Sequence, residues 1–85
     1  MKVKFHKSFV KDYNRADLKV KSAFEKRLGI FFKNPYHISL KNHPLVGAWQ
    51  GYRSVSITGD FRAVYKASGE TAIFVALGTH SKLYD

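Results

Sequence analysis

The chain contains no cysteine, so it can form neither a disulfide nor a thiolate metal site. No apolar run approaches the roughly 18 residues that a membrane-spanning helix requires, and the first residues lack the apolar stretch of a secretory signal. We therefore expect a cytoplasmic protein that does not act at a membrane. Acidic residues are also scarce, because six Asp and Glu stand against fifteen Lys and Arg.

The resulting formal net charge of +9 favours a nucleic acid or an acidic protein as the partner. A basic composition also aids solubility by itself, and it says nothing about the fold. The length of 85 residues is that of one domain, residues 1–85, with a thin core and modest stability.

The first half of the chain predicts one strand followed by two helices. Residues 2–5 alternate between polar and apolar side chains, which indicates a short strand. Apolar residues share one helical face over residues 6–14, where Ser8 is a weak candidate cap. A second amphipathic helix is predicted over residues 18–32, with Asp17 as its N-cap and an Asn-Pro pair after its end.

The second half predicts an ordered connection and three strands. The connection covers residues 36–48, and the strands cover residues 49–57, 61–67 and 71–77. The Thr-Gly-Asp turn at residues 58–60 predicts a hairpin. The order βααβββ predicts an α+β fold, with both helices on one face of a small antiparallel sheet. We expect the first strand beside the last, the apolar last strand inside the sheet, and the other face uncovered.

Two histidines are candidates for proton transfer. His80 follows the last strand, after a Gly-Thr pair predicted to leave the sheet and before a short tail over residues 81–85. From there its side chain can project over the uncovered face, although an exposed tail histidine is the alternative. His43 precedes Pro44 in the connection, and its alternative is a surface or structural role. The other two histidines have no such context, and no pair has helical ligand spacing, so we predict no metal site.

Four further side chains are candidates for binding or catalysis. Arg62 lies inside an apolar strand, which is costly unless its head group reaches water or an anion. We predict that it points to the uncovered face and binds phosphate, with a salt bridge as the alternative, and we interpret Arg53 similarly. Asp60 is either a plain turn residue or a carboxylate that orients a histidine or acts as base. Tyr84 either stacks on a nucleobase or packs back on the core.

Three stretches of the chain form a joint motif: LKNHPLVGAWQGYR at residues 40–53, GDFRAVYK at 59–66 and LGTHSKLY at 77–84. Together they resemble the RelE/ParE superfamily of toxins from bacterial toxin–antitoxin pairs, and most of all the YafQ-type mRNA interferases. The resemblance covers the whole chain in length and element order. It is specific from residue 43 to residue 84 and diffuse in the helices.

That resemblance implies a type II toxin that acts as a ribosome-dependent endoribonuclease. Toxins of this kind cut mRNA in the ribosomal A site, use the ribose 2′-hydroxyl as nucleophile, and need no metal or other cofactor. An acidic antitoxin wraps and silences them, so the implied partners are mRNA, rRNA and a cognate antitoxin. The positive charge fits all three partners. We expect the toxin alone to be a monomer.

The resemblance also implies a role for individual residues. The catalytic set is His43, Asp60, Arg62, His80 and Tyr84, and the RNA-binding set is Arg53, Ser56, Phe61 and Lys82. We assign His80 as the general acid and leave the base open between His43 and Asp60. Arg62 is the phosphate clamp, Arg53 adds positive field, and Tyr84 positions the nucleotide.

Two positions depart from the pattern of the YafQ branch. Ser56 stands where that branch has a histidine, and Phe61 stands where it has a tryptophan. A serine hydroxyl cannot transfer protons as an imidazole does, so this chain is expected to use fewer acid–base groups or to depend more on Arg62.

Three other functions compete with RNA cleavage. They are a ParE-like toxin that inhibits DNA gyrase, a degenerate toxin that only binds its antitoxin, and a plain nucleic-acid-binding module. None of them requires His43, Asp60 and His80 together, so the joint presence of these residues favours the nuclease.

Overall fold

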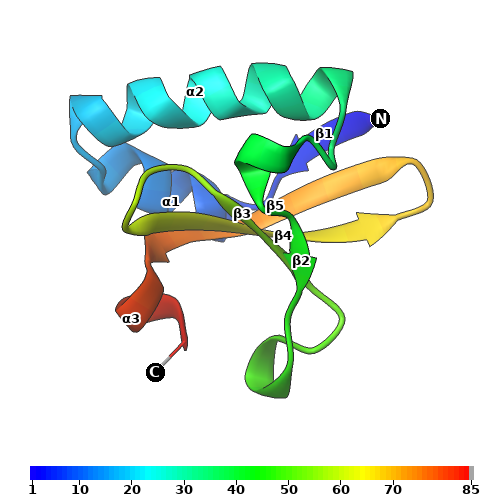
Figure 1. Ribbon diagram of the computed structural model, residues 1–85. Helices are drawn as coiled ribbons and strands as arrows, with labels where there is room; N and C mark the ends of the chain where they lie inside the picture. The colour runs from blue at the N-terminus through cyan, green and yellow to red at the C-terminus, as the bar shows by residue number, and fades with distance from the viewer. Residues whose placement is uncertain (85) are drawn as a thin grey trace.

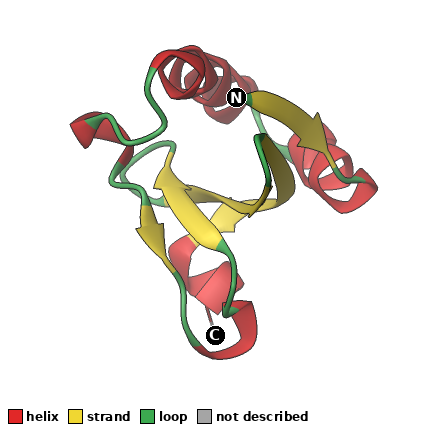
Figure 2. Cartoon of the chain, turned by 90° about the vertical axis from the view of Figure 1, so that its right-hand side faces the viewer, coloured by secondary structure: helices red, strands yellow, loops and turns green. Residues whose placement is uncertain are grey.

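The computed structural model describes residues 1–84 and has an α+β architecture, shown in Figure 1. Its elements are β1 (Lys2–Phe5), α1 (Lys7–Arg15), α2 (Leu18–Lys33), η1 (Ile38–Leu40), β2 (His43–Pro44), η2 (Gly47–Trp49), β3 (Arg53–Ser56), β4 (Phe61–Ser68), β5 (Thr71–Thr79) and α3 (His80–Tyr84). Helices α1 and α2 lie on one side of the sheet, and α3 lies on the other side (Figures 1 and 2). None of the helices in residues 1–84 is long and apolar enough to cross a membrane.

The five strands form one mixed sheet in the order β1-β5-β4-β3-β2. The predicted α+β fold is confirmed, and so are the place of β1 beside β5 and the interior place of β5. The sheet is not wholly antiparallel, however, because β1 runs parallel to β5. The other neighbours are antiparallel, and tight turns connect β3 to β4 and β4 to β5. Strand β1 reaches β5 without such a turn, so nothing local requires it to run in the opposite direction.

The two helix starts show one wrong and one correct prediction. Ser8 does not cap α1; the cap is His6, whose Nδ1 accepts a hydrogen bond from the backbone N–H of Ser8 at 3.1 Å. The Ser8 hydroxyl instead donates to the carbonyl of Val75 at 2.6 Å, which ties α1 to β5. Asp17 caps α2 as predicted, because its side chain accepts from the N–H of Val20 at 3.0 Å.

The predicted strand over residues 49–57 is too long, since β3 contains only Arg53–Ser56. Gly47 and Gly51 have φ angles of +67° and +92°, and such left-handed backbone interrupts a strand. The chain therefore forms the short η2 turn and a bend before it enters the sheet. Conversely, His43–Pro44 was predicted as part of a connection but forms the edge strand β2.

The end of the chain also differs from the prediction. Gly78 and Thr79 stay in β5, and His80–Tyr84 forms the helix α3 where a tail was expected. Asp85, the last residue of that tail, lies outside the described residues. Helix α3 folds back on the sheet and brings the side chain of Leu83 close to Gly78. A β-carbon added at position 78 would lie 3.4 Å from that side chain. The face predicted to be uncovered is therefore partly covered.

The core lies between the sheet and the helices α1 and α2 and is mainly aromatic. The rings at its centre are Phe9, Phe24, Phe31, Tyr65 and Phe74, and each is at most 3% exposed. Aromatic pairs contribute about 0.5–1.5 kcal/mol each beyond area burial, so this cluster fixes the helices on the sheet.

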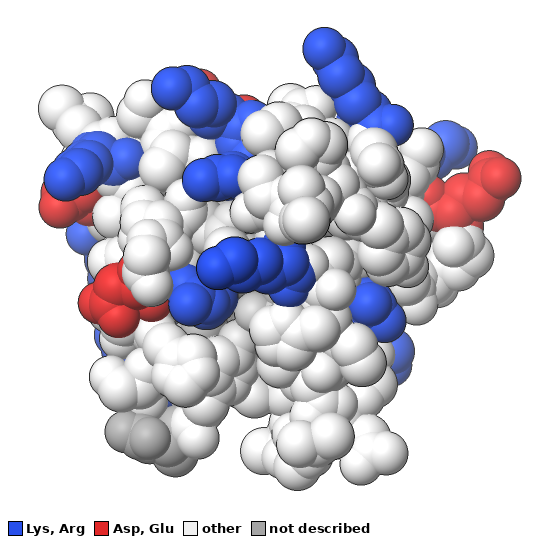
Figure 3. All heavy atoms as spheres, in the orientation of Figure 1, with Lys and Arg blue, Asp and Glu red and all other residues white. Residues whose placement is uncertain are grey.

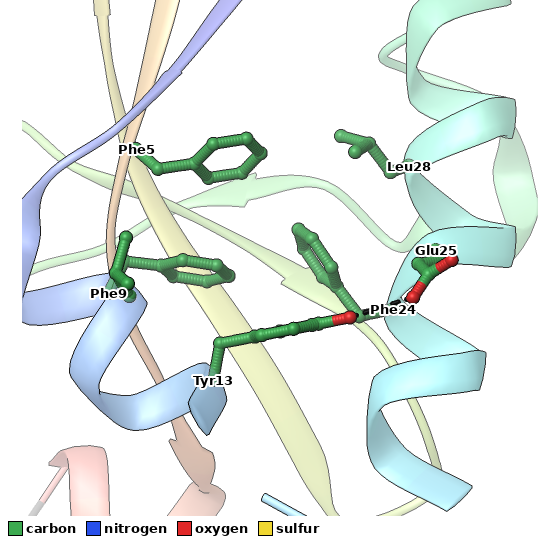
Figure 4. A pocket seen from close by; sticks show the side chains of 7 residues that line it. Phe5, Phe9, Tyr13, Phe24, Glu25 and Leu28 are labelled. Atoms are coloured by element: carbon green, nitrogen blue, oxygen red, sulfur yellow. Dashed lines mark hydrogen bonds between the residues drawn. The ribbon is translucent and has the colours of Figure 1, made fainter. Parts of the chain in front are cut away.

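Where the cluster reaches the surface, an apolar pocket of about 240 Å³ opens between β1, α1 and α2 (Figure 4). At its rim the Tyr13 hydroxyl donates to Glu25 at 2.7 Å. This hydrogen bond raises the pKa of Tyr13 above its ordinary value.

Candidate functional site

Strand register separates the side chains of the sheet into two faces. Ser54 pairs with Val64 and Ser56 pairs with Arg62, so these four side chains share one face. Val55, the residue between the two serines, belongs to the core under α1 and α2. The four residues therefore lie on the opposite face, which we call the α3 face. His43 pairs with Ser54, so it shares this face at the sheet edge.

The His43 ring has a fixed orientation. Its Nδ1 lies 2.8 Å from the carbonyl oxygen of Lys41, which has a left-handed φ of 48°. A carbonyl oxygen can only accept, so Nδ1 carries the hydrogen. In the neutral imidazole the free lone pair is then on Nε2, the form that a base requires. The residue is exposed, so a substrate can reach that nitrogen.

Helix α3 brings His80 and Tyr84 onto the α3 face. The Tyr84 hydroxyl donates to the hydroxyl of Ser54 at 2.7 Å, and Ser54 is completely buried. The His80 ring meets the Tyr84 ring edge-on, with 4.7 Å between the centroids. The indole Nε1 of Trp49 donates to the carbonyl of Leu83 at 2.8 Å, which holds the end of the helix.

Asp60 and Arg62 lie at the same end of the sheet as His80. The backbone N–H of His80 donates to the carbonyl of Asp60 at 3.0 Å. Nη1 of Arg62 donates to the carbonyls of the turn, at 3.0 Å to Thr58 and 3.3 Å to Gly59. These bonds hold the guanidinium over the turn and leave Nε and Nη2 to other acceptors, so a bound phosphate could be one of them.

All five residues of the predicted catalytic set thus lie on or beside the α3 face. Ser54 and Tyr84 connect the two histidines, because Ser54 is the cross-strand partner of His43 and Tyr84 contacts His80. An imidazole at each end of this set, with Asp60 and Arg62 at the same end of the sheet as His80, can move protons and bind an anion.

Arg53 does not join this set. It pairs with Tyr65 and faces the side of the sheet that carries α1 and α2, so the prediction that it points the same way as Arg62 is wrong. Alternation along β3 puts residue 53 on the face of residue 55. Its Nε donates to Asn42 Oδ1 at 2.8 Å, and its guanidinium lies 5.3 Å from the centre of the Tyr36 ring. Arg53 therefore lies away from the α3 face, and its role in RNA binding stays a prediction.

The other three predicted RNA-binding residues lie at three different positions in the fold. Ser56 lies on the α3 face opposite Arg62, and Lys82 is exposed on α3. Phe61 packs partly against the core. Figure 3 shows Lys and Arg side chains spread over one side of the molecule, while the lowest part of that view is mostly white.

Tyr65 is a titratable residue of the core and lies outside the candidate site. Burial raises the pKa of its phenol above the ordinary value of 10.0, and a hydrogen bond from Asn42 acts in the opposite direction. The hydroxyl is therefore neutral near pH 7 and faces the helices, away from His80. Among residues 1–84, no three His, Asp or Glu side chains come together in a way that could hold a metal ion.

Trp49 and Ser54 are the contacts that sequence reasoning missed. It placed Trp49 in a strand and gave Ser54 no structural role, whereas both residues hold α3. The LKNHPLVGAWQGYR motif includes Trp49, but nothing local indicates a bond to a residue so distant in the chain.

Replacing Trp49 with phenylalanine should loosen α3 without unfolding the sheet. The change removes the 2.8 Å bond to Leu83 and keeps an aromatic ring beside Tyr52. We expect a loss of about 0.5–1.5 kcal/mol in unfolding free energy and faster amide hydrogen exchange in α3. Tyr52→Phe is the matched control, since it also removes one polar atom from this ring pair. Equal exchange in the two variants would contradict the role of Trp49.

Known proteins share this sequence pattern and fold. A family model described as "Bacterial toxin of type II toxin-antitoxin system, YafQ" matches residues 1–85. The mRNA interferase toxin YafQ of Escherichia coli strain K12 is 39% identical over 44 residues, which are 52% of this chain and 48% of that protein. The matching region thus spans about half the length of the curated relatives.

Solved structures match the fold of this chain over nearly its whole length. The crystal structure of YafQ from E. coli strain BL21(DE3) gives a TM-score of 0.82 at 24% identity, covering 98% of this chain and 97% of that one. A chain of the E. coli DinJ–YafQ complex gives 0.69 at 26% identity, with coverage of 98% and 97%. The fold is that of toxins from bacterial toxin–antitoxin pairs. The chain belongs to the YafQ family of type II toxins, as its motifs predicted.

Proposed function

We propose that this toxin is a ribosome-dependent endoribonuclease that cleaves mRNA in the A site without a metal ion. One observation carries the proposal: His43, Asp60, Arg62 and His80 lie on or beside one face of the sheet, where Ser54 and Tyr84 join the two histidines. The name of the E. coli relatives, mRNA interferase toxin, supports the same activity. Residues 1–85 act as a single toxin domain in this proposal.

The reaction needs one base and one acid. The base takes the proton of a ribose 2′-hydroxyl, and that oxygen attacks the adjacent phosphorus in line. The bond from phosphorus to the 5′ oxygen then breaks, and the acid protonates the departing oxygen. Nε2 of His43 has the free lone pair for the first step, and the carboxylate of Asp60 is the alternative base. His80 is the general acid.

Charge and position come from the remaining residues. Arg62 is fixed over the β3–β4 turn and stabilises the negative charge that builds on the phosphorane oxygens. Tyr84 lies against the His80 ring, and its anchored hydroxyl limits where that ring can move. Ser56 faces Arg62 but cannot replace an imidazole, so the reaction depends on the two remaining histidines.

We also propose an acidic antitoxin as the protein partner. The E. coli DinJ–YafQ complex is the precedent, and the net charge of +9 suits both an acidic chain and rRNA. Competition between these two partners for one positive protein would then control the toxin, which alone is monomeric and acts in the cytoplasm.

Mapping cut sites on mRNA with and without ribosomes tests the nuclease. We expect cuts at defined codon positions only when the message is in a translating ribosome. Cuts in free mRNA at the same rate would overturn the ribosome dependence. A DNA gyrase supercoiling assay on the same preparation separates the ParE-like alternative, which predicts intact mRNA and loss of supercoiling.

A further inference from the structure

A hollow of about 390 Å³ adjoins the proposed reaction centre, where the end of α1 meets the ends of β4 and β5 and the helix α3. Its lining includes Asp12, Arg15, Asp17, Phe61, Thr79 and Lys82. Phe61 follows Asp60 and Thr79 precedes His80, the two residues joined by a 3.0 Å backbone bond. The hollow therefore lies at the end of the sheet that carries Asp60 and His80, although the Phe61 side chain faces the side of α1 and α2. Its volume lies within the roughly 300–1,000 Å³ typical of ligand sites.

Two cations and one aromatic ring meet in this hollow from distant parts of the chain. Arg15 is exposed in the last turn of α1, and Lys82 is exposed on α3. A guanidinium and an ammonium that line the same hollow suit a phosphate group. The half-exposed Phe61 ring offers a surface on which a nucleobase can stack.

Two carboxylates in the lining each accept a backbone hydrogen bond at one of their two oxygens. Asp12 Oδ2 accepts from the N–H of Leu77, and Asp17 Oδ1 accepts from the N–H of Val20, both at 3.0 Å. These bonds fix both side chains and do not use the second oxygen of either. An ionised carboxylate only accepts hydrogen bonds, so this wall favours a base that carries an amino group.

We propose that the hollow is a nucleotide subsite next to the scissile phosphate. It takes a nucleotide whose phosphate contacts Arg15 and Lys82 and whose base stacks on Phe61 with an exocyclic amino group toward Asp12 and Asp17. This inference rests on RNA as the substrate of the proposed function, and it adds Arg15 to the residues that bind RNA.

Arg15→Gln tests the phosphate contact, with Lys11→Gln as the matched control. Both variants lose one positive charge from an exposed position on α1, but only Arg15 lines the hollow. The probe is short oligo(C), bound to the chain and followed by amide chemical shifts. Arg15→Gln should weaken binding about tenfold, because a charge-assisted hydrogen bond is lost. Lys11→Gln should change only the long-range attraction.

Asp17→Asn tests the base contact while keeping the helix cap. Asparagine caps as well as aspartate does, and with its oxygen on Val20 N–H its amide N–H₂ replaces the spare acceptor by a donor. Oligo(C) and oligo(U) are matched probes, because cytosine has an amino group where uracil has a carbonyl. The wild-type chain should prefer oligo(C) by about tenfold, and Asp17→Asn should lose or reverse this preference with an unchanged thermal midpoint.

The outcomes separate this subsite from the proposed function. Binding of oligo(C) with the expected variant effects, but no cutting of mRNA on ribosomes, would leave the subsite and overturn the nuclease. Absence of oligo(C) binding by the wild-type chain would overturn the subsite. Equal binding by Arg15→Gln and Lys11→Gln, or an unchanged base preference in Asp17→Asn, would overturn it as well, whether or not mRNA is cut.

Discussion

Replacing His80 with alanine is expected to slow mRNA cleavage on ribosomes by about 10²–10⁴-fold, the usual contribution of one proton-transfer group. The imidazole is exposed and contacts the Tyr84 ring, while the backbone bond from His80 to Asp60 does not depend on the side chain. The variant should therefore fold like the wild type. Single-turnover cleavage over a range of pH measures the effect.

The pH profile distinguishes an acid from a positioning group. A general acid delivers a proton in the reaction, so His80→Ala should change the shape of the pH–rate profile, whereas loss of a positioning group should lower the rate equally at every pH. His37→Ala is the control, because His37 is an exposed histidine that only caps the η1 turn. A His80→Ala variant that is folded and cuts at the original rate would remove His80 from the mechanism.

Replacing Phe74 with alanine is expected to cost about 3–5 kcal/mol of unfolding free energy, as large-to-small changes of buried aromatic residues do. Phe74 is 1% exposed on β5, between both layers of the fold. Its ring centroid lies within 6.0 Å of five others: Phe5, Phe9, Phe24, Phe31 and Tyr65. A domain of this size has only about 5–15 kcal/mol in total, so this single change should remove a large part of its stability.

Urea unfolding measures that loss, and Phe32→Ala is its matched control. Phe32 is 52% exposed on α2, so the same chemical change there should stay within about 0.5 kcal/mol. Phe74→Leu keeps most of the volume and should stay folded, which allows the rank order to be measured. Equal losses at positions 74 and 32 would mean that the aromatic cluster is not the main source of stability.

Features that depend on neighbouring residues could be predicted from the sequence. Asp17 caps α2 because a carboxylate before an amphipathic segment meets free backbone N–H groups. The turn at Thr58-Gly59-Asp60 joins β3 to β4, and the register of this hairpin puts Arg62 on the face that was predicted for it. Arg53 could also have been placed correctly, since it lies two residues before the core residue Val55 on the same strand and therefore shares its face.

Features that depend on distant residues could not be predicted. Helix α3 has five residues, fewer than the roughly 12–15 that an isolated helix needs, and its contacts with Trp49 and Ser54 hold it. Arg15 has no signal either, because it is one of many cations on the polar side of a helix. Only the position of α3 beside the end of α1 brings Lys82 into the same hollow as Arg15.

The parallel pairing of β1 with β5 has a consequence for biosynthesis. The partners of Lys2–Phe5 are residues 71–74, so the first strand made by the ribosome has no neighbour until nearly the last one is made. His80 and Tyr84 are synthesised later still. A nascent chain can therefore assemble the proposed reactive centre only after both β5 and α3 have been synthesised.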